Sequence, residues 1–160
     1  LVEQLQRHSV DREYSAIVYG HMIAGGTVDE PIGRDPKDRV KQAVLTSGKD
    51  AITHYRAIDR FKSHTHVKAI LETGRTHQIR VHLSYVGHSL IGDPMYGGRV
   101  RFPKKASEEL KDALLNFKRQ ALHSKKLSLT HPISGESMSW KAPLPDDMTK
   151  LLEVLKKFDS

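Results

Sequence analysis

The sequence lacks several features whose absence narrows the class of protein. It has 160 residues and no cysteine, which excludes disulfide bonds and metal sites built on thiolates. No apolar run approaches the roughly 20 residues that a membrane-spanning helix needs. Residues 1–7 do not form the apolar segment of a signal peptide, and the chain does not begin with methionine. We therefore expect a cytoplasmic protein with no membrane partner, and a sequence that is a piece of a longer chain.

Acidic residues are the minority among the charged ones. The sequence has 26 Lys and Arg against 19 Asp and Glu, which gives a formal net charge of +7. Each phosphate that a basic surface neutralises releases a condensed counterion, so this balance favours a polyanionic partner. A surface that is merely solvated is the alternative. The composition alone already favours nucleic acid.

The pattern of apolar residues and turn residues predicts one α+β domain. Strand-like runs occupy residues 13–19, 51–59 and 65–72, and residues 125–130 and 137–141 suggest a hairpin around a turn at 131–135. Residues 1–7 resemble the end of a helix, residues 31–48 read as a polar loop, and further helices begin after Ser107 and Pro145. We expect a mixed, mainly antiparallel sheet flanked by helices.

A short helix is predicted after the strand that ends near residue 72. Thr76 is the candidate N-cap. Ile79, Leu83 and Val86 have the spacing of a buried helical stripe, and Gly87 stands where a glycine ends many helices.

The start of this helix carries an unusual concentration of cationic and amide side chains. Arg75, His77, Gln78 and Arg80 fall within six residues. Cations at a helix N-terminus oppose the helix dipole, so an anion is their natural partner. The planar guanidinium of Arg80 suits a bidentate grip on one carboxylate. A basic helix start screened by water is the alternative.

Two further residues each have two possible roles. Asp93, in a Gly-Asp-Pro turn, suits hydrogen bonding to nearby backbone N–H groups better than service as a general base. Tyr14, at a strand start, has the position of a half-buried packing residue, or else of a platform on which a nucleobase stacks.

The remaining candidates are basic. Ten histidines invite a metal site, but His77 and His82 fall on different faces of a helix, and His64 and His66 lack an evident third ligand. We therefore expect no metal. A segment rich in cations follows the Gly-Asp-Pro loop and is either an RNA contact or a solvated loop; it contains Arg99, Arg101, Lys104 and Lys105.

The motifs around this cluster resemble those of the ribosomal large-subunit RNA pseudouridine synthases. They are residues 74–82 (Gly-Arg-Thr-His-Gln-Ile-Arg-Val-His), residues 87–88, residues 92–97 (Gly-Asp-Pro-Met-Tyr-Gly) and residues 119–123. The resemblance implies an isomerase that needs no cofactor and no metal and acts on uridines of 23S-type ribosomal RNA, as an expected monomer. It implies that Arg80 pairs with a catalytic aspartate and that Tyr14 stacks on the uracil. Arg75, His77 and Gln78 would then face the RNA.

The sequence also departs from this family. The His-Arg-Leu-Asp stretch that carries the family's catalytic aspartate is absent from residues 1–160, and Ser89 replaces a usual proline. We expect the chain to be the C-terminal part of the catalytic domain, inactive alone and destabilised because Arg80 lacks its carboxylate. The alternatives are an RNA-binding remnant without catalysis and a hydrolase that uses a metal or an Asp93–histidine pair.

Overall fold

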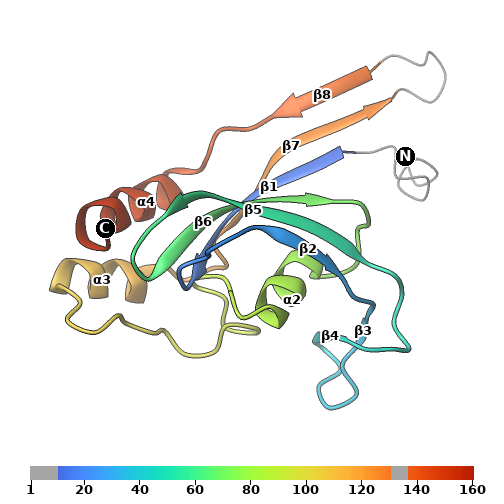
Figure 1. Cartoon of the computed structure of the whole chain (residues 1–160), viewed down its shortest axis with the longest axis horizontal. Coiled ribbons are helices and arrows are strands. Elements are labelled where there is room, and N and C mark those ends of the chain that lie inside the picture. Colours follow the sequence, from blue (N-terminus) through green and yellow to red (C-terminus); the bar gives the residue numbers. More distant parts are fainter. Residues whose placement is uncertain (1–10, 131–136) are drawn as a thin grey trace.

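A computed structural model describes residues 11–130 and 137–160 of the chain. Within these residues, six strands form one sheet in the order β2-β5-β6-β1-β7-β8, and every neighbouring pair is antiparallel. The strands are β1 (Asp11–Tyr19), β2 (Gly26–Asp29), β5 (Ile52–Arg60), β6 (His64–Leu71), β7 (Leu122–Thr130) and β8 (Ser137–Lys141). The helices are α2 (Gln78–Tyr85), α3 (Glu108–Asn116) and α4 (Asp146–Phe158). The predicted α+β class is confirmed (Figure 1).

The central strand β1 has a buried residue at every position from Ser15 to Tyr19, because the sheet is covered on both faces there. Ala16 and Val18 pack in a core with α2. Ile17 and Tyr19 point to the opposite face and pack in a second core with α3 and α4. The helices therefore leave the N-terminal half of β1 less covered than its C-terminal half.

Helices α3 and α4 close one end of the sheet. Ser107 caps α3 as predicted, and its hydroxyl accepts a hydrogen bond from the Leu110 N–H at 3.1 Å. At the end of α4, the buried Asp159 carboxylate binds His64 of β6 at 2.8 Å. Both side chains are almost fully buried, so this pair fixes the end of α4 against the sheet.

Helix α2 begins one residue later than the sequence suggested. Thr76 is not its N-cap: that position belongs to His77, which has a left-handed backbone (φ 57°) and makes no capping bond through its side chain. Ile79 and Leu83 are buried and Val86 packs against them, as predicted. Gly87 ends the helix with φ 91°, which confirms its predicted role.

The polar stretch at residues 31–48 is also more ordered than a loop. It forms a small two-stranded sheet, β3 (Ile32–Arg34) with β4 (Gln42–Val44), around a loop centred on residues 35–39. Val81 of α2 packs against this hairpin through Ile32, so α2 lies between the hairpin and the large sheet (Figure 1). The predicted helix end at 1–7 and the turn at 131–135 lie outside the described residues. In the described part, no helix is long and apolar enough to cross a membrane.

Candidate active site

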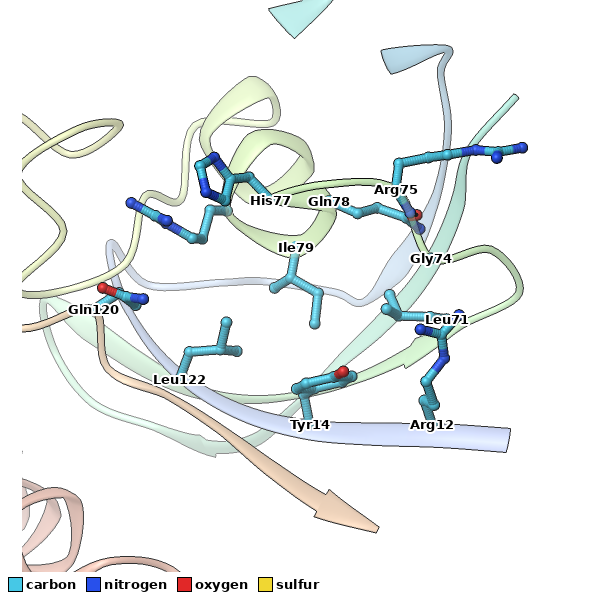
Figure 2. Close-up of a pocket in the computed structure, with 11 residues that line it drawn as sticks. Arg12, Tyr14, Leu71, Gly74, Arg75, His77, Gln78, Ile79, Gln120 and Leu122 are labelled. Carbon is cyan, nitrogen blue, oxygen red and sulfur yellow. Dashed lines mark hydrogen bonds between the residues drawn. The ribbon is translucent and has the colours of Figure 1, made fainter. Parts of the chain in front are cut away.

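A pocket of about 320 Å³ lies between the N-terminal half of β1 and the start of α2. Its floor is the face of the sheet that α2 partly covers, and its wall is the segment from Gly74 to Arg80 (Figure 2). The lining residues are Arg12, Tyr14, Leu71, Gly74, Arg75, His77, Gln78, Ile79, Arg80, Gln120 and Leu122. The pocket thus combines an apolar floor with a cationic rim, and among the described residues no carboxylate lines it.

Arg80 forms a bidentate ion pair with Asp93. Its Nε donates to one carboxylate oxygen at 2.8 Å and its Nη2 to the other at 2.9 Å. The Asp93 side chain is fully buried and that of Arg80 is 11% exposed. The sequence analysis anticipated the bidentate grip but assigned it to an aspartate outside the chain. The expectation that Arg80 lacks a carboxylate partner here is therefore wrong.

Asp93 is held as an anion by its surroundings. Burial alone would raise its pKa, but hydrogen bonds from Arg80 and from the backbone outweigh burial and leave the pKa below its usual range. The same pairing raises the pKa of Arg80. The backbone N–H groups of Met95 and Tyr96 donate to Asp93, which confirms the predicted turn role of this carboxylate.

Tyr96 joins the start of α2 to the β3–β4 hairpin. Its hydroxyl accepts a hydrogen bond from the Gln42 N–H at 2.9 Å and lies 2.7 Å from Nδ1 of His77. Its ring lies 4.9 Å from the Arg80 guanidinium carbon, which is a cation–π distance. Burial and the charge of Arg80 lower the pKa of His77. With His77 neutral and protonated on Nε2, the tyrosine O–H donates a hydrogen bond to Nδ1 and keeps its proton.

Gln78 is buried and acts as a brace for the loop before α2. Its amide oxygen accepts from the Thr73 hydroxyl and the Arg75 N–H, and its amide nitrogen donates to the Ile52 carbonyl and the Thr53 hydroxyl. The amide oxygen and the amide nitrogen of Gln78 each make two hydrogen bonds within the protein. This geometry favours a supporting role for Gln78 over direct contact with a ligand.

The brace continues to His82. The Glu30 carbonyl can only accept, so Nε2–H of His82 donates to it at 2.9 Å; with His82 neutral, Nδ1 then accepts from the Thr53 hydroxyl at 2.8 Å, and that hydroxyl accepts from Gln78. This order of donors requires neutral His82. Burial lowers its pKa, in keeping with that state. A continuous hydrogen-bonded chain therefore fixes α2 on β5.

Tyr14 is half-buried, packs against the α2 core and directs its ring into the pocket (Figure 2). Arg12 lies beside it, two residues earlier on the same strand face. A Cβ on Gly74 would collide with the Arg12 guanidinium, so glycine at that position gives this cation its room. The ring packs against the α2 core, which confirms the packing interpretation, and it also lines the pocket, so the stacking role stays a prediction.

Comparison with known proteins identifies the family. A model of the RNA pseudouridylate synthase family matches residues 1–85. The chain belongs to the RNA pseudouridylate synthase family. It is 56% identical over 156 residues to ribosomal large subunit pseudouridine synthase D of Escherichia coli K12, which covers 98% of this chain and 48% of that protein. The Pseudomonas aeruginosa protein of the same name is 54% identical over 157 residues, with 98% and 49% covered. The chain thus spans about half the length of the curated relatives it matches.

Two solved structures share the fold. Human RNA pseudouridylate synthase domain containing 4 is 26% identical with a TM-score of 0.73, over 97% of this chain and 66% of that one. Human RNA pseudouridylate synthase domain containing 1 is 22% identical with a TM-score of 0.70, over 99% and 71%, and supports the fold alone.

In this member of the pseudouridylate synthase family, the residues predicted to bind RNA fall into two groups. Arg75, His77 and Gln78 line the pocket, where Gln78 serves mainly as the brace of the loop. The second group is remote from it: the Arg101 guanidinium stacks on the Tyr19 ring at 4.2 Å and donates to the Ser89 hydroxyl at 2.6 Å. Tyr19 is at the far end of β1, so Arg101 has a structural contact there. Arg99, Lys104 and Lys105 are exposed on the same segment, outside the lining of the pocket.

Arg12 and Gln120 line the pocket but were missed as site residues. The position of Arg12 could have been predicted, because strand periodicity places it on the same face as Tyr14. For Gln120, the sequence offers only one indication, which is its place in the family motif at residues 119–123. Among the described residues, no group of three or more His, Asp or Glu side chains is placed to hold a metal ion. The hydrogen bonds of Asp93 there go to Arg80, Met95 and Tyr96, so the Asp93–histidine pair that a hydrolase needs does not form.

Proposed function

We propose that this chain is the C-terminal part of the catalytic domain of a pseudouridine synthase that acts on uridines of large-subunit ribosomal RNA. The observation that carries the proposal is the pocket that is lined both by the ring of Tyr14 and by a guanidinium held by Asp93. The names of the curated relatives support the choice of RNA. Ribosomal RNA as substrate implies a cytoplasmic location, and we expect the protein to act as a monomer.

The reaction is an isomerisation. The bond between C1′ of the ribose and N1 of the uracil breaks, the base turns, and C1′ bonds to C5, whose hydrogen leaves as a proton while N1 gains one. A flipped pyrimidine suits a platform such as Tyr14 flanked by the apolar side chains of Leu71, Ile79 and Leu122. Arg80 places positive charge at the rim, where an attacking carboxylate or a phosphate would be stabilised.

The carboxylate that starts this reaction is not among the described lining residues, and Asp93 is fully buried beneath Arg80. We therefore propose that residues preceding Leu1 supply it, which agrees with the length of the curated relatives. The chain alone would then bind RNA without turnover.

The test measures tritium release from ribosomal RNA carrying 5-tritiated uridine. We expect none from residues 1–160, and release when the chain is expressed with the residues that its gene encodes in front of Leu1. In that longer protein, Arg80→Lys should lower kcat by about 100-fold, while Arg119→Lys, at an exposed arginine paired with Asp147, should not. Robust release from residues 1–160 alone would contradict the proposed source of the carboxylate. Salt-dependent RNA binding without release from the longer protein would favour an RNA-binding remnant.

A further inference from the structure

A second pocket, of about 480 Å³, adjoins the candidate active site. It lies between the β3–β4 hairpin and the loop before α2, and it shares Gly74 and Arg75 with the first pocket. Its other lining residues are Ile32, Gly33, Arg34, Gln42, Ser47, Gly48, Lys49 and Thr76. The two pockets therefore lie on either side of Gly74 and Arg75.

The charge of this second pocket is uniform. Arg34, Lys49 and Arg75 line it, and none of its lining residues is acidic. Within residues 11–130 and 137–160, these three cations form no ion pair. Other cations of the chain are neutralised internally, as Lys68 is by Glu13 at 2.8 Å. Three cations that converge on one concave surface without a carboxylate favour an anionic ligand.

The walls of the pocket are fixed before any ligand arrives. The Arg75 Nε donates to the Asp50 carbonyl at 2.7 Å, which orients the guanidinium and leaves both of its terminal nitrogens available. A Cβ on Gly48 would lie 2.5 Å from the Ile32 carbonyl carbon, so the backbone of this loop packs directly on β3. The hydrogen bond from Gln42 to Tyr96 ties the hairpin to the active-site wall. A preformed cationic pocket binds an anion with little ordering cost.

We propose that this second pocket binds a backbone phosphodiester of the substrate RNA, next to the nucleotide whose base enters the first pocket. The inference rests on the proposed function and adds Arg34 and Lys49 to the RNA-contacting residues. Arg75 lines both pockets, so a strand that places a base over Tyr14 carries its neighbouring phosphate past Arg75 toward Arg34 and Lys49. Guanidinium and ammonium groups are the usual partners of phosphate oxygens.

The test is the salt dependence of RNA affinity, measured with a short, single-stranded, uridine-containing RNA on the 160-residue chain and on the longer protein. Arg34→Gln with Lys49→Gln should weaken binding about tenfold. It should also reduce the slope of log K against log salt by roughly 0.7 for each phosphate that the protein no longer neutralises. The matched control is Lys150→Gln with Lys156→Gln, which removes the same charge from exposed positions on α4.

Charge-preserving substitutions separate ligand binding from folding. Arg34→Lys with Lys49→Arg should restore most of the slope and affinity, because an anion site needs the charges more than their shapes. An unchanged slope in the glutamine variant, or equal loss in the α4 control, would overturn the inference. Tritium release from the wild-type longer protein judges the proposed function separately. Its failure would leave the measured slope difference intact.

Discussion

Two arginine–aspartate pairs in this chain have the same geometry and opposite surroundings. In both Arg80–Asp93 and Arg119–Asp147, Nε and Nη2 bind the two carboxylate oxygens at 2.8 and 2.9 Å. The side chains of the first pair are 11% and 0% exposed, whereas those of the second are 42% and 46% exposed. The energetic contribution of an ion pair therefore cannot be judged from its hydrogen bonds alone. We expect the difference in burial to set how much each pair contributes to the stability of the fold.

The buried pair fixes an arginine that lines the candidate site, while the exposed pair only joins surface elements. Asp93 has no access to water, so its charge is balanced by Arg80 and by the backbone N–H groups of its own turn. The guanidinium uses one edge for this pair, and Nη1 takes no part in it. Arg80 therefore lines the pocket in one fixed orientation. Arg119 has the same fork on Asp147, but water competes for both partners.

The largest expected effect comes from removing the carboxylate of each pair. Asp93→Ala leaves Arg80 unpaired in a mostly buried site and should lower the free energy of unfolding by about 3 kcal/mol. Asp147→Ala should lower it by less than about 1 kcal/mol, because that pair is exposed. Urea unfolding of the 160-residue chain, followed by circular dichroism, measures both.

The two variants are each other's control, since each removes one aspartate from one bidentate pair. Equal losses in the two variants would show that the contrast in burial has no energetic meaning. Asp93→Asn sharpens the result, because it keeps the size and the hydrogen bonds to the backbone turn but removes the charge. Its cost should fall between those of the two alanine variants.

Much of the fold follows from local sequence rules. The Ser107 cap, the Gly87 helix end and the buried faces of α2 and α4 are visible in residue order, because helix signals lie within a few positions of one another. The β3–β4 hairpin was missed because its strands are three residues each and its partner, α2, is remote in sequence. Thr76 is not the cap because the left-handed His77 takes that position and the helix begins at Gln78, whose side chain is held on β5, an element remote in sequence.

The site was only partly predictable, because its contacts also join residues that are remote from one another in sequence. A bidentate partner for Arg80 follows from guanidinium chemistry, and a turn role for Asp93 follows from Gly-Asp-Pro. That these two residues bind each other does not follow from either pattern, because the separation of 13 positions along the chain fixes no distance in space. The family resemblance implied an aspartate outside the chain as the partner of Arg80. The second pocket was missed because Arg34, Lys49 and Arg75 converge only after the hairpin has folded onto the loop.

Mild acid should destabilise the folded chain through His82, which is buried between α2 and β5, but should leave the exposed Arg119–Asp147 pair unaffected. Its pKa in the folded chain is lowered by burial, whereas the unfolded value is about 6.5. Between these two values the unfolded chain binds the extra proton, so stability is present above pH ~6.5 and is lost as pH falls. The loss can reach about 1.4 kcal/mol per pH unit for one such group. His82→Gln should flatten the dependence between neutral and mildly acidic pH, although it lowers stability at neutral pH.

The exposed pair again supplies the control. Asp147 has a pKa lowered by its hydrogen bond from Arg119, so it titrates well below this window. Asp147→Asn should therefore leave the slope between neutral and mildly acidic pH unchanged. His64 and His66, whose pKa values are also lowered by burial, keep part of the slope in the His82 variant. If His82→Gln retained the full wild-type slope, the neutral hydrogen-bonded chain from Gln78 to Glu30 would be wrong.

The smallest expected effect concerns Tyr96, through which the buried pair reaches the β3–β4 hairpin. Tyr96→Phe keeps the ring under the Arg80 guanidinium and removes only the hydroxyl that binds Gln42 and His77. Stability should fall by about 1 kcal/mol, since each of the two part-buried hydrogen bonds that are lost contributes about 0.5 kcal/mol, the low end of the usual net value. Tyr85→Phe, at an exposed tyrosine on α2, should change it by much less. Because the hairpin forms one wall of the second pocket, Tyr96→Phe should also weaken RNA binding more than Tyr85→Phe does. Equal RNA affinity in the two variants would show that the hairpin is held against α2 by apolar packing alone, and that the buried pair and the second pocket are independent.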